Sequence, residues 1–307
     1  LSDLELTTLS IATAKDARAN IGTGQFVGSV SNGVVGMAAM DYGRPLGNVT
    51  AKKSWFFFAG GFVALGADIH SSNASNQVNT TLAQVLSDGP TLVHSSSGDE
   101  TTYSQAFSIT ASDTQWTLHD GVGYVLLGSN DTLNIEMAER TGNWNEIGLS
   151  EGTVTDEVFS VWIDHGIQPS GSSYSYAVIP GSTPESLNQM LDGDIPEVLS
   201  NNSSIQAVRH AGTGVSQVAF FEPASLALSA DIQVQSDSAV LMQLIELPGG
   251  DIELSVSDPT GQLANAGIEV RRSLATGGYK SITLPIRFAQ GIKAGKSTVI
   301  RFHLPVA

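Results

Sequence analysis

Cysteine is absent from the 307-residue chain, so neither a disulfide nor a thiolate metal site can form. Basic residues are also scarce: 14 lysines and arginines stand against 30 aspartates and glutamates, which leaves a formal net charge of −16. Phosphate groups need a basic patch, so we expect no nucleic acid partner. No apolar run approaches the roughly 20 residues of a membrane helix, so we expect no membrane partner.

Metal and nucleotide signatures are missing too. The six histidines, at positions 70, 94, 119, 165, 210 and 303, include no His-x-x-x-His pair, which argues against a metal site. There is no Gly-x-Ser-x-Gly elbow, and the glycine pairs at 22–24 and 212–214 lack the strand-to-helix context of a nucleotide loop. We therefore predict no bound metal and no cofactor.

Short apolar runs dominate the chain from Phe26 onward. They alternate with Gly, Ser, Asn and Asp clusters, which is typical of antiparallel sandwiches. One helix is expected at 183–191, because Thr183 can cap it and Pro184 suits its first turn. The expected strands are 25–30, 34–42, 52–58, 62–69, 79–84, 91–94, 116–119, 122–127, 132–140, 157–165, 173–179, 195–200, 205–211, 215–221, 227–234, 239–247, 251–256, 269–273, 280–285 and 297–304.

The most apolar landmark is the aromatic run Trp55-Phe56-Phe57-Phe58. In a half-exposed strand alternate side chains would meet water, so this run predicts a strand buried on both faces. Gly60 and Gly61 end the run, and a second apolar strand begins at Phe62. The two strands are therefore expected to form a hairpin inside a large β structure.

Two histidine–carboxylate neighbours, His119-Asp120 and Asp164-His165, have the composition of an oriented general base. Adjacent strand residues point to opposite faces, however, so neither pair can easily form its own hydrogen bond. We interpret both pairs as structural. Trp55 and Trp162 lie inside apolar runs and are expected in the core.

Two other side chains are candidates for substrate binding. Trp144 lies in the loop-like stretch Thr141-Gly142-Asn143-Trp144-Asn145 and is a candidate platform for stacking on a sugar. Arg44, in Tyr42-Gly43-Arg44-Pro45, is a loop cation that can meet a carboxylate, and a plain surface arginine is the alternative.

Six Asn-x-Ser/Thr sequons indicate a secreted, extracellular glycoprotein, although a chain rich in Ser, Thr and Asn also produces some by chance. The chain begins at Leu1 without a signal-peptide pattern, which predicts a mature, processed or truncated form. The last two sequons overlap, and steric crowding disfavours a glycan on both. The candidate glycosylation sites are Asn48, Asn73, Asn79, Asn130, Asn201 and Asn202.

Three segments carry a resemblance to a known family. The first is Lys52-Lys53-Ser54-Trp55-Phe56-Phe57-Phe58 with Ala64-Leu65-Gly66, and the second is His119-Asp120-Gly121-Val122-Gly123-Tyr124. The third is Val161-Trp162-Ile163-Asp164-His165-Gly166, followed by Tyr174-Ser175-Tyr176-Ala177-Val178-Ile179-Pro180. In order and approximate spacing they resemble the central β-sandwich of polysaccharide lyase family 8, which holds the hyaluronate, chondroitin AC and xanthan lyases. Residues 254–260 resemble that family's last β-domain less specifically.

The resemblance implies β-elimination at the uronate carbon next to the acidic group. In that family a Tyr acts as base and acid, aided by His, Asn and Arg, on an N-terminal α/α toroid and near its junction with the β region. Only 51 residues precede Lys52, so we expect the toroid to be absent from this chain. No catalytic residue is therefore assigned here, and the chain alone is predicted to be inactive.

Together these patterns predict an all-β fold, with a large antiparallel β super-sandwich at 1–222 and a smaller C-terminal β-sandwich at 223–307. The predicted function is that of the β-sandwich part of a secreted polysaccharide lyase, packed on a helical catalytic part held on another or a cleaved chain. The expected partner is an acidic polysaccharide, so positive groups must be concentrated locally or lie on another chain or domain. A free-standing glycan-binding module and a structural shell glycoprotein are the alternatives.

Overall fold

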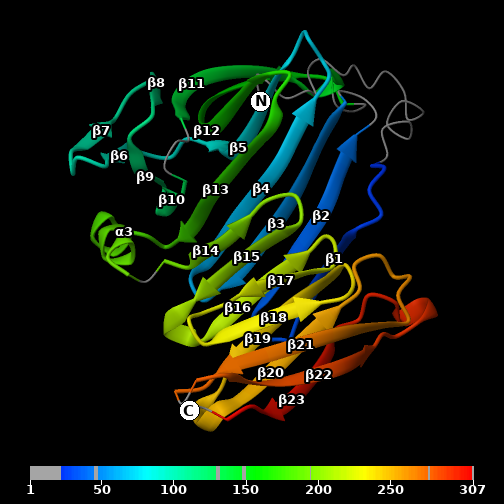
Figure 1. The fold of residues 1–307 in the computed structure, drawn as a ribbon. Helices are drawn as coiled ribbons and strands as arrows, with labels where there is room; N and C mark the ends of the chain where they lie inside the picture. Colours follow the sequence, from blue (N-terminus) through cyan, green and yellow to red (C-terminus); the bar gives the residue numbers. More distant parts are fainter. Residues whose placement is uncertain are drawn as a thin grey trace. The chain divides into compact units, whose positions relative to one another are not determined.

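The structure is a computed structural model that describes residues 22–44, 48–128, 132–146, 150–193, 195–275 and 277–305. Within these ranges the chain is almost entirely β, with a single α-helix (Figure 1), so the predicted all-β fold class is confirmed. Neighbouring strands pair in the antiparallel sense. No helix in the same ranges is long and apolar enough to span a membrane.

Two compact units make up the chain. One contains Tyr42–Ala51 and Ile69–Asn188, and the other contains Gly24–Asp41, Lys52–Asp68 and Gln189–Ala307. These units divide the chain differently from the predicted domains at 1–222 and 223–307, which stay a prediction.

The first unit is built from two sets of antiparallel strands. The strands predicted from the sequence did not include β7 (Glu100–Tyr103) or β8 (Phe107–Ala111). β7 is polar apart from Tyr103, whereas β8 does alternate apolar and polar residues over its short length. One set is a four-stranded sheet in the order β5 (Gln77–Leu86), β12 (Thr153–Ile167), β11 (Leu133–Asn143) and β8 (Phe107–Ala111). The other runs in the order β13 (Ser170–Pro180), β10 (Val122–Leu126), β9 (Thr114–His119), β6 (Thr91–Ser95) and β7 (Glu100–Tyr103).

The expected helix is confirmed as α3 (Pro184–Leu191). The Thr183 hydroxyl accepts a hydrogen bond from the Ser186 backbone N–H at 3.2 Å, which caps the first turn. Leu187 is fully buried against Gly123 of β10, where an added Cβ would lie 2.5 Å from its Cδ2 atom. Gly123 therefore leaves the room that the helix needs to pack on the strand.

The second unit contains β1 (Val27–Ser31) and most of β2 (Gly36–Arg44), which form a hairpin, and most of β3 (Val49–Phe58) and β4 (Gly61–Ser71). Its C-terminal part is a sandwich of two sheets, which Figure 1 shows from green to red. The larger sheet has the order β14 (Glu197–Asn201), β15 (Ile205–His210), β16 (Val215–Phe220), β19 (Val240–Glu246), β20 (Asp251–Ser257) and β23 (Thr298–His303). The smaller has the order β17 (Ala224–Ala227), β18 (Ile232–Ser236), β21 (Asn265–Ser273) and β22 (Tyr279–Arg287).

The single strand expected at 227–234 is wrong, because β17 and β18 are separated by a turn. The Ser229 hydroxyl donates to the Asp231 Oδ1 atom at 2.8 Å within this turn. Ser and Asp side chains compete for local hydrogen bonds in this way and so interrupt strands.

The aromatic run of β3 is not buried on both faces, so that prediction is wrong. Phe56 is fully buried, whereas Phe57 is 46% exposed and Phe58 is half-buried. The ring of Phe57 pairs instead with that of Phe62, with centroids 5.6 Å apart, so aromatic contact on the outer face replaces full burial. Burial on both faces does occur in β4, where residues 63–67 are buried without interruption.

One apolar core fills the C-terminal sandwich. The larger sheet contributes Val218 and Phe220 from β16 and Leu254 from β20, and the smaller sheet contributes Val234 and Ile268. All five are at most 1% exposed. β16 ends before residue 222 and β18 begins after it, so strands on both sides of the predicted boundary share this core.

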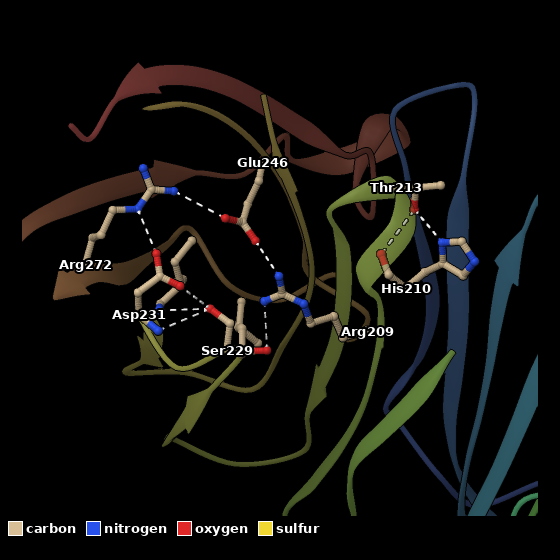
Figure 2. A network of polar contacts seen from close by, with 9 residues as sticks. Arg209, His210, Thr213, Ser229, Asp231, Glu246 and Arg272 are labelled. Carbon is tan, nitrogen blue, oxygen red and sulfur yellow. Dashed lines mark hydrogen bonds and ion pairs between the residues drawn. The ribbon is translucent and has the colours of Figure 1, made fainter. Parts of the chain in front are cut away.

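Glu246, at the end of β19, joins the two sheets of this sandwich through an ionic network (Figure 2). Its Oε1 atom accepts from Arg209 of the same sheet at 2.9 Å, and its Oε2 atom accepts from Arg272 of the opposite sheet at 3.4 Å. Arg272 is 3% exposed, and it also donates to the Leu304 carbonyl at 2.6 Å and lies 3.8 Å from the Asp231 carboxylate. Each arginine thus depends on acceptors that the fold supplies.

We predict that Phe56→Ala lowers the free energy of unfolding by about 3–5 kcal/mol, because it empties a fully buried site. Phe57→Ala is the matched control and should cost about 1 kcal/mol or less, because its ring is half exposed. Urea denaturation followed by circular dichroism measures both. Equal losses would contradict the one-sided burial of β3.

Glu246→Gln should lower the free energy of unfolding by about 3 kcal/mol, because it leaves two arginines without their shared carboxylate. Asp251→Asn makes the same chemical change at an exposed carboxylate and should cost about 1 kcal/mol or less. Thermal unfolding of the two variants compares them. A Glu246→Gln protein as stable as Asp251→Asn would show that the network contributes nothing.

Candidate functional site

Trp144, the predicted sugar platform, lies in a short 3-10 turn that directly follows β11. Its side chain is 50% exposed, and its backbone N–H donates to the Gly152 carbonyl at 3.0 Å. Beside it on the β11–β12 hairpin, the Thr141 and Thr155 hydroxyls lie 2.8 Å apart and are exposed. The surroundings thus combine a flat apolar ring with hydroxyl groups, and the binding role stays a prediction.

Arg44 is the last residue of β2, and residues 45–47 after it lie outside the described ranges. β2 pairs with β1, whereas Trp144 follows β11 of the four-stranded sheet. The two predicted binding residues therefore belong to strands of different sheets, and the binding role of Arg44 also stays a prediction.

His119 is a core side chain, as the structural interpretation expected. It is 2% exposed, its Nδ1 atom lies 2.9 Å from the Thr91 hydroxyl, and its ring stacks on Phe159 with centroids 4.1 Å apart. Burial lowers the pKa of His119, against the opposing effect of nearby carboxylates including Asp120. The imidazole is thus held neutral between strands, out of reach of a large substrate.

The neighbouring Asp120 and Gly121 form the turn between β9 and β10, where His119 and Val122 face each other across the hairpin. Both turn residues have positive φ, 46° and 69°, as a type I′ turn requires. Most of this family-like motif is therefore explained by hairpin geometry rather than by chemistry.

Asp164 and His165 are likewise held by local contacts. Asp164 Oδ1 accepts from the Gly166 backbone N–H at 2.7 Å, and its Oδ2 accepts from Gln77 at 2.7 Å. His165 Nε2 lies 2.8 Å from the Thr80 hydroxyl. Both side chains link β12 to β5 beside it, so the structural interpretation again accounts for them.

Trp55 and Trp162 are half-buried rather than core residues, so that expectation is wrong. Each lies on a strand where alternate positions are buried, and the fully buried tryptophan is Trp116 of β9. Trp162 lies opposite Asn134 of β11 and Thr81 of β5. The four-stranded sheet therefore carries an indole between polar side chains on its outer face. The sequence prediction missed this feature, because it assigned every tryptophan within an apolar run to the core.

Three tyrosines that could serve as a base lie in the interior of the first unit. Burial raises the pKa of Tyr176 to about 12 and raises the pKa values of Tyr124 and Tyr174. A buried phenol with a raised pKa stays protonated near neutral pH, and its burial prevents contact with a polysaccharide. In addition, the described ranges contain no cluster of His, Asp or Glu able to hold a metal ion.

The sequons occupy unlike environments. Asn48 and Asn202 are exposed, Asn73, Asn79 and Asn201 are half-buried, and Asn130 lies outside the described ranges. The Asn201 amide donates to the Gly66 carbonyl at 3.1 Å, so a glycan on that nitrogen would disturb an existing contact. Glycosylation at all six positions stays a prediction.

Comparisons with known proteins identify relatives along most of the chain. The family model described as "Polysaccharide lyase family 8, super-sandwich domain" matches residues 3–191, and "Polysaccharide lyase family 8, C-terminal beta-sandwich domain" matches residues 197–266. The predicted super-sandwich followed by a C-terminal sandwich is thereby confirmed.

Chondroitinase-AC from Pedobacter heparinus is 32% identical over 284 residues, which cover 91% of this chain and 39% of that protein. Xanthan lyase from Bacillus sp. strain GL1 is 29% identical over 262 residues, which cover 81% of this chain and 27% of that protein. A solved chondroitinase AC lyase, studied in complex with oligosaccharides, superposes with a TM-score of 0.79 at 31% identity, over 90% of this chain and 40% of its own. The chain thus spans well under half the length of these relatives.

We predict that His119 makes stability pH-dependent. Burial lowers the pKa of His119 in the folded chain, whereas in the unfolded chain it keeps the ordinary value of about 6.5. As the pH falls through this value the unfolded chain binds a proton that the folded chain does not, so the free energy of unfolding decreases. His119→Gln should show a smaller loss of unfolding free energy between about pH 7.5 and about pH 5.5 than the parent chain. Urea titrations at the two pH values measure it.

His303→Gln is the control for this measurement, because that ring is exposed beside Asp251. Its pH dependence should stay closer to that of the parent chain. An unchanged pH dependence in His119→Gln would show that the buried ring does not govern the acid sensitivity.

Proposed function

The chain belongs to polysaccharide lyase family 8, and we propose that it is the β-sandwich part of a secreted lyase that cleaves uronate-containing polysaccharide. A helical catalytic part, held on another or a cleaved chain, supplies the reacting groups in this proposal. The chain alone is inactive, and it packs on that part and forms one wall of the substrate cleft.

The observation that carries the proposal is the match of both β domains, whose family-like segments contain only buried tyrosines. β-Elimination removes the proton from the uronate carbon next to the carboxyl group, forms a carbon–carbon double bond, and releases the glycosidic oxygen with a proton. This needs a base within hydrogen-bond reach of the sugar. The buried tyrosines and the buried His119 do not offer one.

The class of substrate is supported by the names of the relatives, which include chondroitin, xanthan and hyaluronate lyases. Secretion is supported by the sequons, of which Asn48 and Asn202 have exposed side chains. The second candidate function is a free-standing glycan-binding module. The half-exposed ring of Trp144 favours it, since exposed indoles suit sugar faces.

Denaturing intact-mass analysis of material purified from the native source tests the proposal. We expect the β sequence either within a longer polypeptide or together with an equal amount of a second, helix-rich chain. That assembly should produce the ultraviolet absorbance of an unsaturated uronate from chondroitin, hyaluronan or xanthan, whereas the isolated 307-residue chain should produce none.

A lone species at the 32.1 kDa of this sequence, with no helical partner and no product, would contradict the proposal. Saturable sugar binding by that lone chain would then place the binding-module function first. Absorbance generated by the isolated chain would show instead that it contains its own base.

A further inference from the structure

The chain contains a single Asn-Gly pair, Asn32-Gly33, in the turn that joins β1 to β2. An asparagine before a glycine is prone to deamidation, because the glycine nitrogen can attack the side-chain amide carbon without hindrance from a side chain of its own. Gly33 is exposed, has φ of 92°, and an added Cβ there would meet no atom within 4 Å. The attacking nitrogen therefore lies in an open turn that water reaches.

The side-chain carbonyl of Asn32 is held by two backbone donors. Its Oδ1 atom accepts from the N–H groups of Val34 at 3.0 Å and Val35 at 3.1 Å. Attack on the amide carbon moves negative charge onto this oxygen, and fixed backbone donors stabilise such charge as it develops. The turn thus supplies a small oxyanion site for the reaction.

The hydrogen of the attacking nitrogen has an acceptor in the same turn. The Gly33 N–H donates to the Ser31 hydroxyl oxygen at 2.9 Å, and this hydroxyl donates to the Val35 carbonyl at 2.8 Å. Ser31 is exposed as well, so solvent hydroxide reaches these hydrogen bonds. Ser31 and solvent are therefore placed to remove the proton that Gly33 must lose.

The amide nitrogen of Asn32 lies against a buried carboxylate of the larger C-terminal sheet. Its Nδ2 atom donates to Glu253 Oε1 of β20 at 2.8 Å, and Glu253 is 6% exposed. Glu253 Oε2 accepts from Arg301 Nε at 2.8 Å. The hydrogen bond from Asn32, followed by that from Arg301, holds the pKa of Glu253 below its ordinary value. Glu253 is therefore ionised at neutral pH.

We propose that Asn32-Gly33 is a self-modification site, which deamidates in the folded chain and so loosens the β1–β2 hairpin from β20. The Gly33 nitrogen loses its proton and bonds to the Asn32 Cγ atom, the Cγ–Nδ2 bond breaks, and Nδ2 leaves with a proton as ammonia. Water then opens the five-membered succinimide ring and leaves aspartate or isoaspartate at position 32. The reaction needs water alone, and the site goes beyond the proposed function.

The loosening follows from the position of Glu253. Either product carries a carboxylate where an amide donated, so two negative groups meet at hydrogen-bond distance and repel one another. Isoaspartate also adds one carbon to the backbone of the turn. The neighbouring contacts of β1, which include the bond from the Ser257 hydroxyl to the Ser29 carbonyl at 2.8 Å, should then weaken.

Asn202, in the same unit, provides an internal comparison. Its Oδ1 atom accepts from the N–H groups of Ser204 at 2.9 Å and Ile205 at 2.8 Å, which is the pattern seen at Asn32. The residue after Asn202 is a serine, however, and its side chain hinders attack by its own nitrogen. The Asn202 amide also donates to the Ser200 hydroxyl at 3.1 Å, not to a carboxylate.

Ageing of the 307-residue chain, produced in bacteria and so free of glycans, tests the site at neutral and at mildly alkaline pH. Peptide mass spectrometry should show position 32 deamidating at least about tenfold faster than Asn202, because glycine leaves its nitrogen open. The rate should rise with pH, and protein isoaspartyl methyltransferase should label the product. Ser31→Ala should slow the reaction several-fold in the folded chain and leave it unchanged in urea.

Hydrogen–deuterium exchange measures the loosening. Exchange in β1 and β2 should be several-fold faster in the aged chain, and Asn32→Asp should reproduce this without ageing. In a Glu253→Gln chain, Asn32→Asp should have little further effect, because the repelling charge is gone. Asn202→Asp is the control for added charge and should leave β1 and β2 unchanged.

An Asn32 amide that survives in the folded chain as long as that of Asn202 would overturn the site, by showing that the turn protects the residue. Deamidation at equal rates in the parent and Ser31→Ala chains would overturn the role of Ser31. Deamidation without faster exchange in β1 and β2 would overturn the loosening. None of these measurements involves a polysaccharide or lyase activity, so this site and the proposed function fail separately.

Discussion

The C-terminal sandwich depends on one apolar core to which strands far apart in the sequence contribute. Strand geometry sends alternate side chains to opposite faces, so each strand that fills the core must also build a second surface. Phe220 and Ile268 both lie in this core, and the residues beside Ile268, Gly267 and Glu269, are consequently turned outward. Core packing and the polar outer face are thus two consequences of the same alternation.

The Glu246 network shows how this sandwich tolerates charge inside. Arg272 is almost fully buried, which is costly for a cation unless fixed acceptors surround it. Glu246 and the Leu304 carbonyl provide them, and Leu304 itself belongs to the apolar core. The backbone that directly follows β23 is thereby held both by the packing of Leu304 and by the hydrogen bond from a charged arginine.

The family-like motifs of the first unit serve the fold rather than the chemistry. His119 is enclosed by Thr91 and Phe159, and the Asp120-Gly121 turn has the backbone that a tight hairpin needs. Gly123 makes room for Leu187 of the helix. Such positions are constrained by geometry, so a related chain can retain them whether or not it carries the catalytic groups. Function in this chain is therefore expected on surfaces, where Trp144 is exposed.

The sequence by itself determined the all-β class, most strands and the capped helix, because period-two alternation and turn residues are local signals. The family followed instead from the resemblance of three sequence segments. It could not decide how the run from Trp55 to Phe58 is buried, since that depends on which partners cover each face, and Phe57 meets Phe62 in the open. It also left the sharing of one core by Phe220 and Ile268 undecided, because these residues lie on strands far apart in the sequence. The cations of residues 265–307 could be counted from the sequence, but only the tertiary structure placed Arg271 against Tyr279 and exposed Lys280 and Arg287, because strand pairing alone fixes which side chains become neighbours.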